Sequence, residues 1–357
     1  MDQTSFLLRL RTMNDSMLLK TSLVVSIIIA CLAVLAALQA AAAQPSVQTL
    51  YACVINNKTF VVGADNPKTG LFYTTDDGKD WNHMGWTNGR PFGIGLDTSA
   101  HPPTIYLAEG NGVHKSIDGG KTWAIKTGWE ITEVQKITID PKDHSILYIA
   151  TPYGVWKSTD GGGTWARKTK GLKEVRDTFI TSIVIDRSNT NRLLLSSENG
   201  VFESIDAGES WHASGLQGKA VRRLVDGPES SAHLLVGTED DGVFVSDNGG
   251  RTWQERNNGL IHKTVYAIAI DPNNPDVFYA GGFKSGVFRS SDGGRTWKNS
   301  KTGLTNLDIH SIAVSPSDSK TVYAGTIGGG VFKSTDAGET WTYIGLESCL
   351  VWDLKVY

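Results

Sequence analysis

The chain has 357 residues and a formal net charge of −3, from 34 Lys and Arg against 37 Asp and Glu. This balance excludes the basic surface of a general nucleic-acid binder. The 3 cysteines exclude a disulfide-rich scaffold and a four-thiolate zinc site. The 39 glycines and 11 tryptophans indicate many tight turns, each held by a large apolar side chain.

An uncharged, mostly apolar run occupies residues 22–43, after three basic residues. This run is long enough to span a bilayer, and the small residues at its end suit cleavage by signal peptidase. We therefore expect residues 1–43 to be a signal peptide or an N-terminal membrane anchor, followed by a short linker at 44–48. Either alternative predicts that residues 49–357 are exported to a secreted, periplasmic or lumenal location. The membrane would be contacted only through the N-terminal segment.

One eight-residue pattern, Ser/Thr-x-Asp-x-Gly-x-Thr-Trp, occurs seven times with a period of 42–46 residues. Internal repeats of this length are typical of propellers and solenoids. The third position holds Asp76, Asp118, Asp160, Asp206, Asn248, Asp292 and Asp336, and the last holds Trp81, Trp123, Trp165, Trp211, Trp253, Trp297 and Trp341.

Short β-rich runs fill the rest of each repeat, as in VQKITID, ILYIAT and GVWKSTD of residues 134–160. A further run follows each Trp. Four short strands separated by Gly, Asn and Asp turns describe one four-stranded antiparallel blade. The chain is therefore predicted to be all-β, a seven-bladed β-propeller over residues 49–357 with one such turn per blade.

The residue types of the turn have physical reasons. A short carboxylate can accept backbone N–H groups across a tight turn, glycine supplies positive φ, and an indole can pack against a neighbouring strand. We expect these residues to stabilise the fold. Neither the turns nor the scattered histidines predict a metal or cofactor site.

The repeated segments resemble the Asp-box (BNR) repeat of sialidases, xyloglucanases, sortilin-type receptors and the propeller-shaped photosystem II assembly factor. In that family the boxes lie between the third and fourth strands, opposite the usual active or binding face. The resemblance implies that the box residues are structural and that ligands meet the other face.

The last residues, LVWDLKVY at 350–357, align with VYAIAI at 265–270. We expect this C-terminal strand to close the ring by joining the first or the last blade. LYACVI and TFVVGA of residues 50–64 are predicted as the first two strands of the first blade. Cys53 and Cys349 lie in the two segments that would meet, which predicts a disulfide; two separate buried thiols are the alternative.

The face opposite the boxes carries aromatic and basic residues in the loops that enter each first strand or join the second to the third. Arg176, Arg222 and Arg223 would favour acidic ligands, and two tryptophans are candidate anchors. The predicted ligand-binding rim comprises Trp86, Arg90, Trp129, Tyr153, Arg176, Arg222, Arg223, His262 and His310.

The sequence is compatible with two functions. A glycosidase needs two carboxylates about 5–9.5 Å apart, and a pair could be drawn from Glu109, Asp177, Glu239, Asp240 and Asp241. The Arg-Ile-Pro motif of sialidases is missing, however, and the loops are short. The sequence therefore favours a monomeric, non-catalytic binding or scaffold propeller whose partner is a protein, peptide or glycan. A polysaccharide-active hydrolase is the alternative.

Overall fold

The computed structural model describes residues 48–56, 68–87, 89–228 and 232–357. The predicted signal peptide or anchor lies outside the described residues, as does TFVVGA. Among the described residues no helix has both the length and the apolar character needed to cross a membrane.

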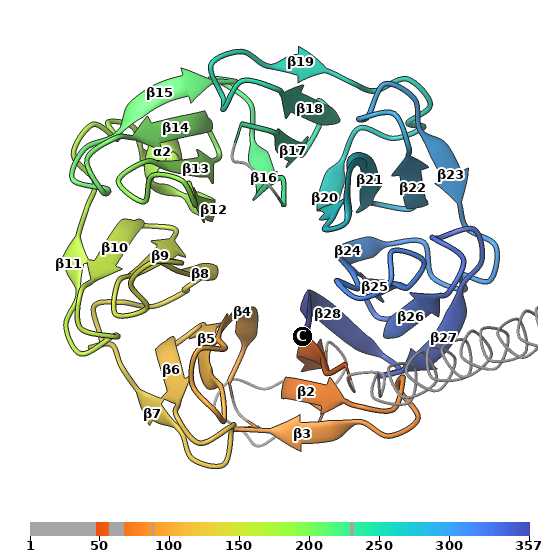
Figure 1. Ribbon diagram of the computed structural model, residues 1–357, viewed down its shortest axis with the longest axis horizontal. Helices are drawn as coiled ribbons and strands as arrows, with labels where there is room; N and C mark the ends of the chain where they lie inside the picture. The colour runs from red at the N-terminus through yellow and green to blue at the C-terminus, as the bar shows by residue number, and fades with distance from the viewer. Residues whose placement is uncertain (1–47, 57–67, 88, 229–231) are drawn as a thin grey trace, which may run out of the picture. The chain divides into compact units, whose positions relative to one another are not determined.

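The described strands form seven four-stranded antiparallel sheets around a central axis (Figure 1). This arrangement confirms the predicted all-β, seven-bladed propeller. We number the blades 1 to 7 in chain order, so that blade 1 contains Leu50 and blade 7 contains Ile309.

Each blade has an inner, a second, a third and an outer strand (Figure 1). The inner strands of blades 1 to 7 are β28 (Cys349–Val356), β4 (Pro91–Asp97), β8 (Lys136–Ile139), β12 (Ile180–Ile185), β16 (Val221–Asp226), β20 (Val265–Asp271) and β24 (Ile309–Val314). The second strands are β1 (Leu50–Asn56), β5 (Thr104–Glu109), β9 (Leu147–Thr151), β13 (Leu193–Ser197), β17 (Leu234–Thr238), β21 (Asn274–Gly282) and β25 (Val322–Thr326).

The third strands are β2 (Gly70–Thr74), β6 (Gly112–Ser116), β10 (Gly154–Ser158), β14 (Gly200–Ser204), β18 (Val243–Ser246), β22 (Gly286–Ser290) and β26 (Val331–Ser334). The outer strands are β3 (Asn82–Met84), β7 (Ala124–Ile125), β11 (Ala166–Arg167), β15 (His212–Gly215), β19 (Gln254–Glu255), β23 (Lys298–Ser300) and β27 (Thr342–Gly345). One short helix, α2 (Val175–Thr178), precedes β12.

Blade 1 is completed by the C-terminal strand. β28 pairs antiparallel with β1 and is the inner strand of that sheet, whose order is β28-β1-β2-β3. The prediction that LYACVI is a first strand is therefore wrong, because that position belongs to β28 and LYACVI is second. Of the two expected ways to close the ring, the chain uses the first blade.

The predicted disulfide is also wrong, because both Cys53 and Cys349 are free buried thiols. In the β1–β28 register Cys53 faces Asp353, whereas Cys349 faces Asn56, three residues further along β1. Three residues of strand span about 10 Å, which is beyond the reach of a disulfide. The alternative, two separate buried thiols, describes the structure.

The core lies between the faces of neighbouring blades. One apolar cluster, for example, joins Leu194 and Val201 of blade 4 to Leu234 and Phe244 of blade 5. The second strands are buried along nearly their whole length because both of their faces meet another blade. This explains why they read as continuous apolar runs rather than as alternating ones.

Three hydrogen bonds are common to the seven repeated turns and a fourth is present in five of them, and the turn of Asp292 shows all four. The Ser290 hydroxyl and the Thr296 backbone N–H donate to Asp292 Oδ1, at 2.8 and 2.9 Å, and the Thr296 hydroxyl donates to Oδ2 at 2.6 Å. The Gly294 N–H donates in turn to the Ser290 hydroxyl at 2.8 Å. Both carboxylate oxygens are therefore bound within the turn.

Backbone angles explain which glycines the turn requires. The fourth position has φ between 57° and 72° and accepts Asp77, Ala207 and Ala337 as well as glycine. The fifth position has φ between 82° and 90° and is glycine in every copy. The first range lies in the left-handed region that other residues can enter, whereas the second lies beyond it and requires glycine.

The tryptophans join neighbouring blades. In five copies the indole N–H donates, at 2.7–2.9 Å, to a backbone carbonyl on or beside the outer strand of the preceding blade. Trp81 of blade 1 thereby binds Ile344 of blade 7, so this contact also crosses the closure of the ring. Trp341 reaches the Ser300 hydroxyl of the preceding blade at 3.3 Å, whereas Trp123 binds Gly120 in its own turn.

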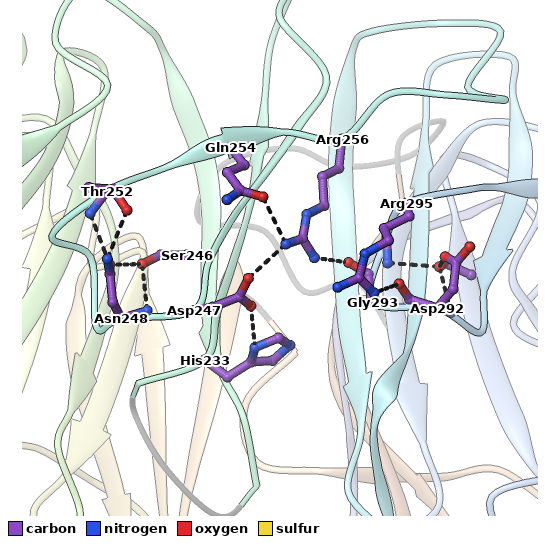
Figure 2. Close-up of polar contacts among 12 residues, drawn as sticks. His233, Ser246, Asp247, Asn248, Thr252, Gln254, Arg256, Asp292, Gly293 and Arg295 are labelled. Carbon is purple, nitrogen blue, oxygen red and sulfur yellow. Dashed lines mark hydrogen bonds and ion pairs between the residues drawn. The ribbon is translucent and has the colours of Figure 1, made fainter.

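A buried arginine adds a further link between the turns of blades 5 and 6. Figure 2 shows the Arg256 guanidinium donating to Asp247 Oδ2 at 2.7 Å and to Gln254 Oε1 at 3.0 Å. It also donates to the carbonyl of Gly293 in the next blade. The face that carries the turns is thus cross-linked by hydrogen bonds from blade to blade.

Candidate functional site

The opposite end of the central channel opens into a cavity of about 640 Å³, which we call the mouth. Each blade contributes to it one residue near the start of its inner strand. We call these residues the upper layer: Trp352, Phe92, Gln135, Thr181, Arg222, Tyr266 and His310, in the order of blades 1 to 7.

β-Bulges position most of the upper layer. In six blades the pairing of the inner with the second strand skips one residue, and the skipped residue is the one in the upper layer. In blade 5, for instance, Val221 pairs with Thr238 and Arg223 with Gly237, so that Arg222 is opposite no residue of β17. Bulges bend the strand and change the direction of a side chain. They place six different side chains at the mouth.

Four consecutive blades provide an aromatic arc, formed by Phe92, Trp352, His310 and Tyr266. Adjacent ring centroids lie 4.9, 4.6 and 5.8 Å apart in that order. These distances are typical of favourable aromatic contacts. The arc offers a wall on which a flat or apolar group can pack.

The other three blades provide a polar arc of Gln135, Thr181 and Arg222. The Arg222 guanidinium forms ion pairs with Glu198 and with Glu239, the first at 3.2 Å. At the rim, Arg90 is bound to Glu133 at 2.8 Å. Arg90 and Arg222 therefore each form ion pairs with carboxylates.

One residue deeper, each inner strand contributes to a lower layer, formed by Asp353, Gly93, Lys136, Ser182, Arg223, Ala267 and Ser311. Three members are charged. Asp353 Oδ2 lies 2.6 Å from Lys136 Nζ, and Asp353 Oδ1 lies 3.1 Å from Arg223 Nη1. This triad joins blades 1, 3 and 5 through the channel.

Small residues make room for the triad. Lys136 reaches blade 1 across Gly93 of the intervening blade, where an added Cβ would lie 3.1 Å from Lys136 Cδ. The side chains of Lys136 and Arg223 are 19% and 13% exposed. Both line the mouth and also a second cavity of about 610 Å³ on the other side of the triad.

The triad carries two cations and one carboxylate, and the pKa values of the groups around it reflect this excess of positive charge. Burial alone would raise the pKa of Asp353, but Lys136 and Arg223 lower it to about 2. Burial, with Arg223 as the next cause, lowers the pKa of Lys136 to about 8 and that of His310 to about 4. At this depth of the channel the ionised form of a carboxylic acid is favoured, and the protonated, positively charged forms of lysine and histidine are disfavoured.

The predicted rim residues fall into two groups. Arg90, Arg222, Arg223 and His310 meet at the mouth. The other five lie elsewhere on the same side of the ring: Trp86 packs on His114, Arg176 donates to the Glu198 carbonyl, and Trp129, Tyr153 and His262 are exposed.

The acids proposed for hydrolysis lie in three blades, because Glu239, Asp240 and Asp241 share the β17–β18 loop of blade 5. Asp177 accepts the backbone N–H groups of Lys173 and Glu174, and Asp241 is paired with Lys219. Glu239 is paired with Arg222, and Asp240 follows it in the β17–β18 loop. None of these acids lines the mouth. The described residues also contain no group of three or more His, Cys, Asp and Glu side chains placed to hold a metal ion.

Glu109 is buried beside His114, with Oε2 and Nδ1 3.5 Å apart. Burial raises the pKa of Glu109 to about 8 and lowers that of His114 to about 4. Burial therefore favours the uncharged form of both groups.

Sequence reasoning missed Phe92, Lys136, Tyr266, Trp352 and Asp353. The alignment of VWDLKV with VYAIAI already places Trp352 beside Tyr266 and Asp353 beside Ala267. Comparing that column across all seven repeats would have revealed the aromatic arc.

The seven four-stranded sheets define a seven-bladed β-propeller. The GH74 enzyme of Niastella koreensis is similar in structure, with a TM-score of 0.67 and 18% identity over 82% of this chain and 54% of that one. The GH74 xyloglucanase of Xanthomonas campestris has a TM-score of 0.62 and 18% identity, over 79% of this chain and 52% of that one. The structure of YCF48 bound to D1 peptide has a TM-score of 0.53 and 14% identity, over 78% of this chain and 91% of that one.

This chain thus spans about half the length of the two GH74 proteins it matches. No protein-family model and no curated protein matches its sequence.

Proposed function

We propose that this protein is an exported, non-catalytic binding propeller that holds a protein, peptide or glycan ligand at the mouth of its channel. The observation that carries the proposal is the composition of the mouth. It combines an aromatic arc with basic residues, and Glu133, the one acid among the described residues of its wall, is paired with Arg90. Such a wall can bind a ligand but offers no pair of acids for glycoside hydrolysis.

The structural likenesses support binding in two ways. YCF48 is similar over most of its own length, and its structure was solved with a peptide bound. The GH74 enzymes are matched over only about half of theirs. Export is supported by the apolar run at residues 22–43.

The test compares binding and turnover with the full-length protein. Defined peptide and glycan arrays are probed with wild type, Trp352→Ala and Trp129→Ala. We expect wild type and Trp129→Ala to retain the same ligands and Trp352→Ala to lose them, because Trp352 is central to the aromatic arc whereas Trp129 is 92% exposed and lies outside the mouth.

In parallel, xyloglucan and other polysaccharides are incubated with wild type and released reducing ends are measured. We expect no release above background. Release that Glu109→Gln or Glu239→Gln abolishes would instead establish the hydrolase alternative. Retention of all ligands by Trp352→Ala would remove the mouth as the binding site.

A further inference from the structure

We infer that the mouth recognises a carboxylate carried next to a flat, apolar group, and that Lys136 and Arg223 are the residues that bind this carboxylate. The inference rests on the proposed function, because it names the ligand chemistry of the same mouth. It follows from the charge of the lower layer, from N–H donors there that have no acceptor among the described residues, and from the aromatic arc that lines the same cavity.

The triad has one more positive charge than it can neutralise internally. Lys136 and Arg223 share the single carboxylate of Asp353, and among the described residues neither has another acceptor. A lysine ammonium has three N–H donors and a guanidinium has five. Most of these donors therefore lack an acceptor among the described residues, and both side chains line the mouth.

The excess charge is confined to this depth. The neighbouring cations are already compensated, since Arg90 pairs with Glu133, and Arg222 pairs with Glu198 and Glu239. A ligand anion consequently gains most from entering as far as Lys136 and Arg223. There it would lie in a partly enclosed, low-dielectric site where charge-assisted hydrogen bonds are strong.

The size of the excess selects the anion. One uncompensated positive charge matches a carboxylate, whereas a phosphate, with a charge of about −1.5 to −2 near neutral pH, would leave negative charge buried. The aromatic arc lines the same cavity as Lys136 and Arg223, and one of its members, Trp352, directly precedes Asp353 of the triad in sequence. The group attached to the carboxylate therefore meets aromatic rings.

The test measures binding by titration calorimetry, with indole-3-acetate and its uncharged analogue indole-3-acetamide as probes. Wild type should bind the acid at least tenfold more tightly than the amide. Lys136→Met should lower the affinity for the acid at least tenfold and remove the preference for acid over amide. This variant leaves Arg223 and Asp353 as a neutral pair, so the fold keeps a balanced charge.

Lys298→Met is the matched control, because it removes a lysine that is 71% exposed and distant from the mouth. It should bind the acid like wild type. Inorganic phosphate is titrated as a second anion and should bind more weakly than the acid. Tighter binding of phosphate would overturn the assignment of a carboxylate.

The inference and the proposed function fail in different ways. Equal affinity for acid and amide, with both lost in Trp352→Ala, would refute the carboxylate site while leaving the mouth as a binding site. An unchanged preference for the acid in Lys136→Met would overturn the roles of Lys136 and Arg223, and so would binding of neither probe to wild type. Ligands from the arrays that bind without contacting the mouth would refute the proposed function itself.

Discussion

The two ends of the central channel follow opposite rules. On the face of the repeated turns, equivalent positions hold the same residue types, and the carboxylates are bound within their own turns. At the mouth, the seven equivalent positions of the upper layer hold seven different residue types. The same strands therefore build a regular face at one end and an individual one at the other.

This difference separates residues that build the ring from residues that can select a ligand. A feature that each blade repeats satisfies a need that each blade has, such as a tight turn or a contact with the neighbouring blade. A ligand that enters the channel meets all blades at once and requires a different group from each. The upper and lower layers have this asymmetry, and the repeated turns lack it.

The largest effect should come from a tryptophan of the repeated turns. Trp211 is only 1% exposed and donates to the Lys168 carbonyl of the preceding blade. Trp211→Ala should lower the free energy of unfolding by about 3–5 kcal/mol, through lost apolar burial and a cavity. Chemical denaturation measures the change. Trp129→Ala removes an exposed indole, and its free energy of unfolding should stay within about 0.5 kcal/mol of wild type. Equal losses in the two variants would contradict the distinction between residues that build the ring and residues that can select a ligand.

The next effect concerns the triad. Asp353→Asn leaves two buried cations without a counter-ion and should cost about 3 kcal/mol of stability. Adding Lys136→Met to this variant removes one of the cations and should recover part of the loss. A double-variant protein no more stable than Asp353→Asn alone would show that the charge of the triad is not what matters.

Acid should weaken the same contact. The pKa of Asp353 is about 2 in the folded protein, below its ordinary 3.8. The stability that its ionised carboxylate contributes to the fold is therefore fully present above pH 3.8 and is lost as the pH falls through 2. The difference between the two pKa values corresponds to about 2 kcal/mol.

Stability measured from pH 6 to 2 for wild type and Asp353→Asn isolates this contribution, because five turn aspartates also have pKa values of about 2 in both proteins. The two curves should converge at low pH. Parallel curves would contradict the assignment.

The smallest effect belongs to a single turn hydrogen bond. Thr296→Val removes the hydroxyl that donates to Asp292 Oδ2 and should cost at most about 1 kcal/mol. It should also raise the pKa of Asp292, which that hydroxyl helps to lower. Carboxyl NMR titration gives the pKa directly. The turn of Asp76 already shows the expected state, because Asp80 replaces the threonine and donates only its backbone N–H.

The repetition in the sequence was sufficient to predict seven blades, their four strands and the position of the turns, because each repeat carries its own turn residues and apolar runs. The exchange at Asn248 shows how local this logic is. Its amide oxygen accepts the Thr252 N–H, and its amide nitrogen donates to the Thr252 hydroxyl, in place of the bond that an aspartate would accept. A local pattern predicts local structure well.

The mouth was harder to predict because it depends on register across the ring. Arg223 and Asp353 are 130 residues apart, and their contact requires the C-terminal strand to occupy the inner position of blade 1. Assigning LYACVI to that position hid this contact and brought the two cysteines together incorrectly. Four of the nine residues predicted for the rim from loop membership line the mouth, but bulges and the closing strand decide which side chains meet.

The inner position of blade 1 is filled by β28, which leaves the ribosome after every other described strand. Blades 2 to 7 can assemble during synthesis as a curved array, while blade 1 still lacks the strand that completes it. Asp353 arrives on that strand, so Lys136 and Arg223 face each other without a counter-ion until the last step. The ligand site that we propose therefore comes into existence only when the ring does, and an incomplete chain would present neither.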